Sequence, residues 1–219
     1  MIFYDYWRSS SAWRVRIALN IKQITVERRA VNLAPDGGAQ HTDSFRALNP
    51  MSQVPVLVIA DSPGPPRTLT QSMAILEYLE ERFPSPPLLP VDPWLRGRAR
   101  QLAEMVNAGI QPMQNLSLLQ RLDEGGLADP KEVARYHIVR GLGAIEAIAG
   151  ETAGSFLVGD TPTIADLYLV PQLYSGRRFN VDLSPFPTLL AIEASCAALP
   201  AFAAAHPDVQ PDAPAASKS

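Results

Sequence analysis

Short apolar runs and amphipathic stretches alternate through residues 1–83. Four runs have the apolar or β-branched composition of strands, and they cover residues 2–6, 25–31, 54–59 and 68–70. The stretch that follows Ser11 and residues 71–82 carry apolar side chains at helical spacing instead. The predicted order of elements, β-α-β-α-β-β-α, is that of a mixed four-stranded sheet with helices on its faces.

Prolines crowd residues 84–93, and we predict a linker there because proline lacks a backbone N–H and fixes its own φ. Beyond this linker we find no strand pattern. Helical patterns cover residues 94–122 with a bend or interruption at 109–112, residues 131–148, a stretch from Thr163 onward, and residues 187–199. We therefore predict an all-helical domain over residues 94–207 and a flexible, polar tail over residues 208–219.

The composition removes several classes of protein. The 219 residues are 47% hydrophobic and 19% charged, a balance that excludes a largely disordered chain. The formal charge of −3 gives no electrostatic footprint for nucleic acid or an anionic membrane. No apolar run approaches the roughly 18 residues of a spanning helix, and no signal peptide is visible. We expect a cytoplasmic protein that binds neither nucleic acid nor membrane.

A metal site and a disulfide or redox pair formed by the protein's own cysteines are also not expected. The single cysteine, Cys196, excludes an internal disulfide framework, a zinc knuckle and a Cys-x-x-Cys redox pair. The three histidines, His41, His137 and His206, have no metal-ligand spacing around them, so we predict no metal site. If the protein is an enzyme, we expect a bound cofactor to supply its reactive group.

Three hydroxyl residues, Ser9, Ser10 and Ser11, stand where the first predicted helix begins. Serine caps helices by accepting a hydrogen bond from a free backbone N–H. The same N–H groups and the helix dipole also stabilise an anion such as a thiolate. The residues alone favour capping and leave an anion site open.

A similar alternative applies at the start of a second predicted helix. Gln71-Ser72 opens the helix over residues 71–82, either as a cap or as a site for a carboxylate. Val54-Pro55, taken alone, is the start of a strand. Thr163 and Asp166 have the spacing of a capping box, and we assign them to starting a helix rather than to chemistry.

Four separated segments resemble one family. They read WRSSSAWRVRIAL at residues 7–19, LNPMSQVP at 48–55, QSMAI at 71–75 and GIQPMQNLS at 109–117. In this order they are similar to the signatures of the zeta class of cytosolic glutathione transferases, which comprises maleylacetoacetate and maleylpyruvate isomerases. The resemblance extends over residues 1–212.

The resemblance implies the cytosolic glutathione transferase architecture. A thioredoxin-like, glutathione-binding domain is expected over residues 1–83 and an all-α substrate domain over residues 94–207, assembled as a homodimer. Glutathione is the implied cofactor and a small-molecule diacid the implied substrate. The implied reaction is the cis–trans isomerisation of maleylacetoacetate to fumarylacetoacetate by thiolate addition, rotation and elimination.

Three alternatives stay open. The protein could be a maleylpyruvate isomerase, a glutathione S-transferase acting on α-halo acids, or a non-catalytic glutathione-binding protein. Ser11 stands where the class usually has cysteine. Because serine cannot form a mixed disulfide with glutathione, reductive dehalogenation is not expected.

The resemblance makes Ser9, Ser10 and Ser11 the implied catalytic and glutathione-binding cluster, with Ser10 as the hydroxyl that donates to the glutathione sulfur. Tyr4 and Tyr6 on the first strand are expected to pack, and Tyr6 is only a fallback for Ser10.

The implied glutathione contacts continue beyond the serines. Val54-Pro55 is expected to be cis and to pair with the cysteinyl unit of glutathione. Gln71 and Ser72 are expected to bind the γ-glutamyl carboxylate, and Gln40 to reach the glycyl carboxylate.

A stretch of the second domain is implied to line the hydrophobic-substrate side of the site, and Gln111 and Asn115 in it are expected among the glutathione-binding residues. Gln111 and Asn115 are predicted on one helix, four residues apart and on one face, with Ser117 two residues further along. A diacid needs planar partners for its carboxylates, and arginine supplies them. The resemblance points to Arg178, and Arg8 precedes the serine cluster, so both are expected to bind substrate. The remaining basic candidates are Arg14, Arg16 and Arg177, and at least one of Arg14 and Arg16 is expected to make a structural contact.

Overall fold

The computed structural model describes residues 1–33, 38–60 and 64–215, and in it the chain forms two units. One unit consists of Met1–Pro86 and the described part of Pro200–Ser219, and the other of Pro87–Leu199. The division between Pro86 and Pro87 lies inside the predicted linker. Residues 200–207 belong to the first unit, so the prediction that they complete the helical domain is wrong.

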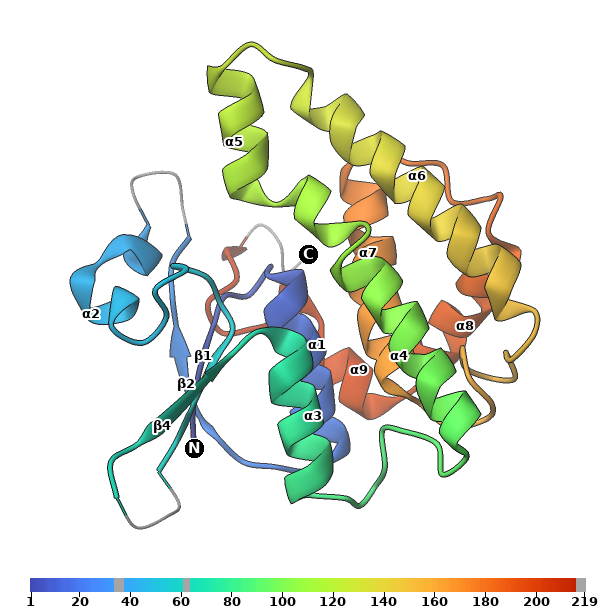
Figure 1. Ribbon diagram of the computed structural model, residues 1–219, viewed down its shortest axis with the longest axis horizontal. Coiled ribbons are helices and arrows are strands. Elements are labelled where there is room, and N and C mark those ends of the chain that lie inside the picture. The colour runs from blue at the N-terminus through green and yellow to red at the C-terminus, as the bar shows by residue number, and fades with distance from the viewer. Residues whose placement is uncertain (34–37, 61–63, 216–219) are drawn as a thin grey trace. The chain divides into compact units, whose positions relative to one another are not determined.

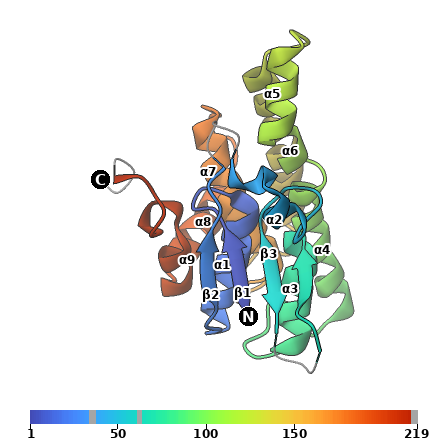
Figure 2. The same ribbon diagram turned by 90° about the vertical axis from the view of Figure 1, so that its left-hand side faces the viewer.

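A mixed four-stranded sheet forms the centre of the first unit, as predicted. Its strands are β1 (Ile2–Asp5), β2 (Glu27–Ala30), β3 (Val56–Ile59) and β4 (Arg67–Thr70). They lie in the order β2-β1-β3-β4, and Figure 2 shows β2, β1 and β3 side by side. β1 runs parallel to β2, while β3 is antiparallel to both of its neighbours.

Helices cover both faces of this sheet (Figure 1). α1 (Ser10–Ile21) packs against α3 (Ser72–Arg82) on one face, and the short α2 (Asp43–Arg46) lies on the other. Side chains of successive strand residues point to opposite faces. A cluster on the α2 face follows that alternation, and it contains Val31, Phe45, Val54, Val56 and Val58.

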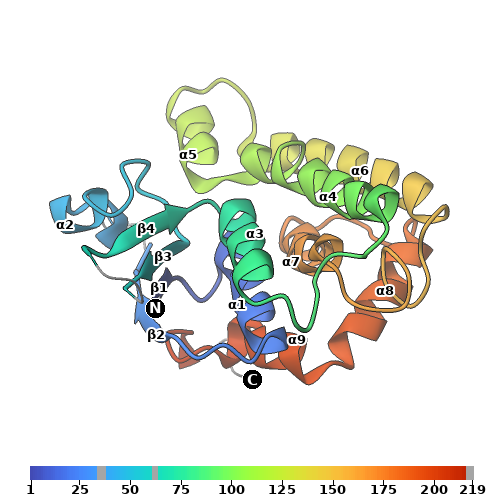
Figure 3. The same cartoon turned by 60° about the horizontal axis from the view of Figure 1, so that its bottom comes forward.

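The described residues of the second unit form helices and no strand, as the sequence predicts. The helices are α4 (Pro93–Asn107), α5 (Leu116–Glu124), α6 (Pro130–Ala149), α7 (Ile164–Arg178) and α8 (Pro187–Ala197), with the 3-10 turn η2 (Gln111–Gln114). α7 is buried over most of its length and packs against α4 and α8 (Figure 3).

The helix predicted over residues 94–122, with a bend or interruption at 109–112, is interrupted there, and the stretch is divided in three. α4 ends at Asn107, η2 follows, and α5 begins behind Asn115. Pro112 lies in the first turn of η2, and proline cannot donate the hydrogen bond that would continue α4. Gln111 and Asn115 therefore do not share one helix face, which corrects the prediction.

The C-terminal segment packs on the first unit. α9 (Pro200–Ala205) lies against α1, and the 3-10 turn η3 (Pro207–Val209) follows it. Gln210 and Ala213 are buried. The predicted flexible tail is therefore wrong for residues 208–215, because polar side chains of this segment find partners in the first unit; residues 216–219 lie outside the described part of the chain.

The predicted capping box at the start of α7 is confirmed. Asp166 is fully buried, and its carboxylate accepts hydrogen bonds from the backbone N–H groups of Leu157 (2.8 Å) and Thr163 (2.7 Å) and from the Thr163 hydroxyl (3.0 Å). Burial raises the pKa of Asp166 to about 6, although these three hydrogen bonds act in the opposite direction. Asp166 thus fixes both the start of α7 and the loop before it.

We expect Asp166→Ala to lower the free energy of unfolding by about 3 kcal/mol, because two buried N–H groups lose their acceptor. Chemical denaturation at pH 7 measures this loss. Asp160→Ala is the matched control, since Asp160 is exposed and accepts one backbone N–H, from Ser155 at 3.0 Å. Equal losses in the two variants would contradict a special role for the buried box.

Candidate active site

The register of the sheet gathers the predicted glutathione residues of the first unit. Tyr4 lies opposite Val56, and Val56 lies opposite Thr70. The C-terminal ends of β1 and β4 therefore lie beside the first residue of β3 at one end of the sheet, which we call the site end. The segments at this end include Ser9–Ser11 after β1, Val54-Pro55 before β3 and Gln71-Ser72 after β4.

The three serines at the start of α1 have different roles. Ser9 is the N-cap, and its Oγ accepts a hydrogen bond from the Ala12 backbone N–H at 3.2 Å. Capping is therefore the role of Ser9. Ser10 and Ser11 are half-buried in the first turn, and among the described residues their hydroxyls make no hydrogen bond. These two hydroxyls remain available beside the positive end of the helix dipole.

The start of α3 is built differently from the predicted cap. Gln71, at the cap position, has a φ of 69° and no side-chain capping hydrogen bond; its Nε2 contacts the Met51 Sδ at 3.6 Å. Ser72 is buried, and its Oγ accepts a hydrogen bond from Arg14 at 3.1 Å. The Gln71 side chain therefore does not cap α3, and the guanidinium of Arg14 lies at the start of this helix.

Arg14 was not predicted as part of the site. It is 1% exposed, and its guanidinium brings positive charge to the N-terminus of α3. Together with the free backbone N–H groups of a helix start, that charge suits a carboxylate. Its sequence position one turn into α1, four residues after Ser10, was compatible with this placement but did not require it.

The peptide bond between Val54 and Pro55 is cis, as the resemblance implies. Val54 is buried, with its side chain in the cluster on the α2 face. Its backbone N–H and C=O have no hydrogen-bond partner among the described residues. An extended peptide could use both groups, in the manner of an added strand.

Gln40 lies on the 3-10 turn η1 (Ala39–His41). A hydrogen bond from the Ala39 N–H to the Asn32 carbonyl (2.8 Å) returns this turn toward the end of β2, which is parallel to β1 and therefore ends at the site end. The Gln40 side chain is buried, with its Nε2 3.2 Å from the His41 Nε2. Its Oε1 has no hydrogen-bond partner among the described residues.

These groups fit an anionic, extended tripeptide. Two helix starts carry serine, one of them reinforced by Arg14, and the buried amide oxygen of Gln40 has no donor within the described part of the chain. Buried polar groups are normally hydrogen-bonded. A ligand that donates a hydrogen bond to the Gln40 amide oxygen would satisfy this acceptor. The set agrees with glutathione as the cofactor.

The tyrosines of β1 and its following loop pack, as expected. Tyr4 meets Phe45 edge to face at 6.2 Å between ring centroids, and its hydroxyl lies 3.0 Å from the Arg29 guanidinium. Tyr6 packs against the cluster on the α2 face and against Trp7. Neither contact favours Tyr6 over Ser10.

The arginines near the serines have separate tasks. Arg16 is buried and pairs with the carboxylate of Asp5 at 3.2 Å, which is the expected structural ion pair. Arg8 is exposed and stacks over the ring of Trp7, with its guanidinium carbon 5.3 Å from the ring centroid. Arg8 is thus the arginine of this group placed for a soluble ligand.

In the second unit, Gln111 and Asn115 differ in their availability. The Oδ1 of Asn115 caps α5 and accepts hydrogen bonds from the backbone N–H and the hydroxyl of Ser117, both at 3.1 Å. Gln111 is half-buried on η2, and no side-chain hydrogen bond engages it among the described residues. Of the predicted pair, Gln111 is the freer to bind a ligand.

The adjacent arginines at the end of α7 also differ. Arg177 is held in two hydrogen bonds by Glu193 (2.6 and 2.5 Å), and these raise the pKa of Arg177. Arg178 is exposed, with its guanidinium carbon 6.0 Å from the centroid of the Phe179 ring. The carboxylate of Glu193 thus occupies the guanidinium of Arg177, and Arg178 stays the predicted partner of a substrate carboxylate.

The chain matches two family models. Residues 8–82 match the glutathione S-transferase N-terminal domain, and residues 66–204 match the glutathione S-transferase C-terminal domain. A protein named maleylacetoacetate isomerase from Mus musculus is 47% identical over 214 residues, covering 98% of this chain and 95% of the relative.

Solved structures give the same picture. A maleylacetoacetate isomerase from Anaeromyxobacter dehalogenans, with glutathione bound in its active site, is 54% identical, covers 97% of each chain and has a TM-score of 0.89. A maleylpyruvate isomerase described as a bacterial zeta-class glutathione S-transferase is 41% identical with a TM-score of 0.90, covering 98% of this chain and all of the other. Both similarities extend over nearly all of this chain.

Proposed function

The chain belongs to the zeta class of the glutathione S-transferase family, and from this premise we propose that it isomerises maleylacetoacetate to fumarylacetoacetate with glutathione as its cofactor. The observation that carries the proposal is the start of α1. There the cap is already supplied by Ser9, so the neighbouring Ser10 hydroxyl is left to meet a sulfur anion. Among the described residues, the Ser10 hydroxyl makes no capping hydrogen bond.

Bound glutathione supplies the nucleophile, whose addition to the cis double bond permits rotation before the sulfur leaves again. The task of the chain is to keep that sulfur ionised near neutral pH. Ser10 donates a hydrogen bond to it, and the N-terminal N–H groups of α1 add the field of the helix dipole. Both interactions favour the charged form of the thiol.

Each end of the tripeptide has its own partner in this proposal. Ser72, with Gln71 beside it and Arg14 behind it, binds the γ-glutamyl carboxylate. The free N–H and C=O of Val54 pair with the cysteinyl backbone. Gln40 uses its unsatisfied side chain to hold the glycyl end. Binding at three points fixes the position of the sulfur.

Arg8 and Arg178 are the proposed partners of the substrate carboxylates. Both are exposed and have an aromatic ring within 6.0 Å of the guanidinium carbon, and a guanidinium can form bidentate hydrogen bonds with a carboxylate. Gln111 contributes a neutral amide. The same groups would stabilise the negative charge that builds up on the diacid during addition.

The absence of a reactive thiol gives a direct prediction. Cys196 is fully buried, and burial raises its pKa, so it is inert to alkylating reagents. We expect the wild type to keep its activity after treatment with iodoacetamide and desalting. Ser11→Cys places a thiol in the first turn of α1, where the dipole lowers its pKa, and should be inactivated. The activity that remains after treatment is measured for the wild type and for Ser11→Cys. Inactivation of the wild type would contradict a site that uses no cysteine of the protein.

A substrate panel tests the proposal. Maleylacetone, maleylpyruvate and an α-halo acid are each incubated with the protein, with glutathione and with S-methylglutathione, and conversion is followed by ultraviolet absorbance. Glutathione-dependent conversion that is fastest for maleylacetone, and absent with S-methylglutathione, is the expected result. Preference for maleylpyruvate would reassign the substrate, and tight glutathione binding without any conversion would remove the isomerase assignment.

We also propose a homodimer in the cytoplasm. Large apolar side chains stay exposed along α5 and α6 and the connection between them, namely Leu116, Leu127, Tyr136 and Val139, and such a surface suits burial against a second copy.

The cytoplasm keeps glutathione reduced, as the reaction requires. No described helix is both long enough and apolar enough to cross a bilayer. Sedimentation and cell fractionation test the two proposals.

A further inference from the structure

The loop between β1 and α1 is held from two sides. From within, Arg16 donates hydrogen bonds to the carbonyls of Tyr6 (3.2 Å) and Trp7 (2.8 Å). From outside, the carboxylate of Asp212 accepts the backbone N–H of Trp7 at 2.9 Å, across 205 residues of sequence. This loop ends at Ser9, the residue that precedes Ser10.

We propose that Asp212 is a positioning residue for the Ser10 site, so that the C-terminal segment is a working part of the glutathione-binding unit; this inference rests on the proposed function. Trp7 lies two residues before the N-cap of α1. Its N–H has no acceptor within the loop, so Asp212 supplies the outer of the two attachments that fix the loop.

The C-terminal segment is itself well anchored. Asn20 on α1 donates to the carbonyl of Ala201 at 3.0 Å. Gln210 is 2% exposed, and its Nε2 donates to the carbonyls of Ala204 (3.0 Å) and His206 (2.7 Å). The bonds of Gln210 form a turn just before Asp212, and the bond from Asn20 joins the segment to α1. The backbone that carries Asp212 is therefore held in place.

Hydrogen bonds and ion pairs also connect the C-terminal segment to β1. Arg28 on β2 donates to the Gln210 side chain at 2.6 Å and to the Asp5 carboxylate at 2.6 Å. Asp5 is 1% exposed and also pairs with Arg16. Two cations, Arg16 and Arg28, thus lie with two carboxylates, Asp5 and Asp212, around the loop. Removing Asp212 takes one anion from this set and one acceptor from the loop.

The consequence for the reaction is geometric. A hydroxyl that stabilises a thiolate must lie within hydrogen-bond distance of the sulfur, and a displacement of about 1 Å is enough to weaken a positioned contact by an order of magnitude or more. Ser9 and Ser10 follow the loop directly, so a loosened Trp7 moves the start of α1. The affinity for glutathione and the ionisation of its thiol should both suffer.

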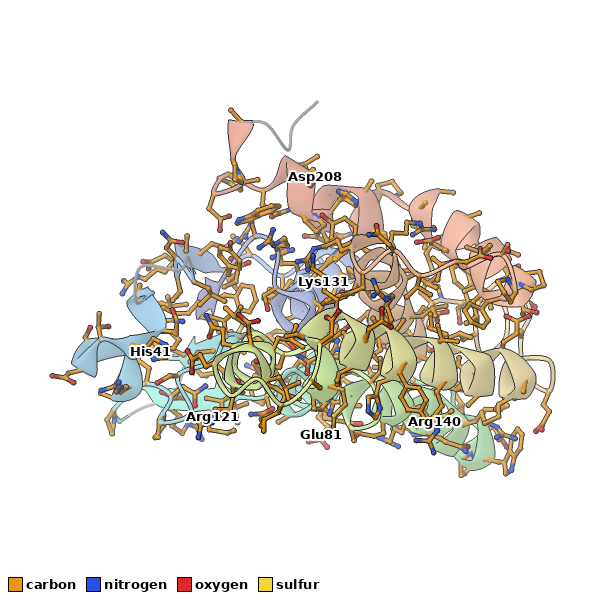
Figure 4. All side chains as sticks on the ribbon, turned by 90° about the horizontal axis from the view of Figure 1, so that it is seen from above. His41, Glu81, Arg121, Lys131, Arg140 and Asp208 are labelled. Atoms are coloured by element: carbon orange, nitrogen blue, oxygen red, sulfur yellow. The ribbon has the colours of Figure 1, made fainter. Side chains whose placement is uncertain are left out.

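The test compares three single variants. Asp212→Ala removes the acceptor, and Asp212→Asn keeps an oxygen acceptor without the charge. Asp208→Ala is the matched control, because it removes the same charge from the same segment. Asp208 is labelled in Figure 4, and its carboxylate lies 3.6 Å from the ring of His206. The measurements are glutathione affinity by calorimetry, the pH titration of the bound thiol by ultraviolet absorbance, kcat/KM for isomerisation, and amide exchange of the peptide containing Trp7.

We expect Asp212→Ala to weaken glutathione binding and lower kcat/KM by about tenfold each, the order of effect of one lost charge-assisted hydrogen bond. The titration of the bound thiol should move to higher pH, and exchange at Trp7 should become faster. Asp212→Asn should stay within about threefold of the wild type in both measurements, because its amide oxygen still accepts the N–H.

Two results would overturn the inference. One is an Asp212→Ala variant that matches Asp208→Ala in affinity, thiol titration and exchange; the other is an Asp212→Asn variant as impaired as Asp212→Ala. Affinity, titration and exchange need no diacid substrate. A wild type that binds glutathione and isomerises nothing would therefore contradict the proposed function alone.

Discussion

We expect Ser10→Ala to lower kcat/KM for glutathione-dependent isomerisation by about 100-fold or more, the usual cost of removing one donor from a developing or stabilised anion in an active site. The Ser10 hydroxyl lies in the first turn of α1 and has no hydrogen bond among the described residues. Its loss raises the pKa of the bound thiol, so less thiolate is present at neutral pH. The pH profile of kcat/KM should accordingly move to higher pH in the variant.

The neighbouring serines provide the controls for Ser10. Ser9→Ala removes the N-cap and should cost about 1 kcal/mol of stability, with a smaller loss of activity than Ser10→Ala causes. Ser11→Ala should have the mildest effect on the pH profile. If Ser9→Ala or Ser11→Ala shifted the profile as far as Ser10→Ala does, the assignment of the donor would be wrong.

The largest expected effect on stability belongs to Lys22→Met, which should lower the free energy of unfolding by about 4 kcal/mol. The Lys22 ammonium is buried at the end of α1. It lies 2.7 Å from the Glu80 carboxylate, 2.7 Å from the Phe83 carbonyl and 2.9 Å from the Pro86 carbonyl. Methionine fills the space but leaves a buried carboxylate and two carbonyls without their common donor.

Two further variants test that reasoning by denaturation. Lys131→Met removes the same charge from an exposed position, labelled in Figure 4, and should change stability by no more than about 0.5 kcal/mol. Lys22→Met/Glu80→Gln should recover part of the loss, because the amide carries no buried charge. A Lys22→Met variant as stable as Lys131→Met would contradict the importance of this clamp.

Local patterns predicted most of the fold. The apolar run at residues 54–59 contains a fully buried strand, β3, and the hydroxyl–acid spacing of Thr163 and Asp166 predicted the start of α7. Both depend on neighbours in sequence, so a pattern can reveal them. The division of residues 94–122 was less predictable, since Gly109 and Pro112 allow either a bend or a break and tertiary packing decides.

Contacts between distant residues could not be predicted in this way. The composition of residues 208–219 is that of a frayed end, yet Gln210 and Asp212 find partners about two hundred residues earlier in the chain. Arg14 was recognised as basic, but its place behind Ser72 depends on how α1 packs against α3. The serine cluster was identified from sequence, whereas the separate role of Ser9 required the geometry of the cap.

As a cofactor, glutathione should return unchanged from each turnover. The measurement is the conversion of excess maleylacetone by this protein with a limiting amount of glutathione, with free thiol titrated before and after. We expect many conversions to the trans isomer for each glutathione and no loss of thiol. One conversion or fewer per glutathione, with thiol consumed as a stable conjugate, would contradict this expectation and describe a transferase instead.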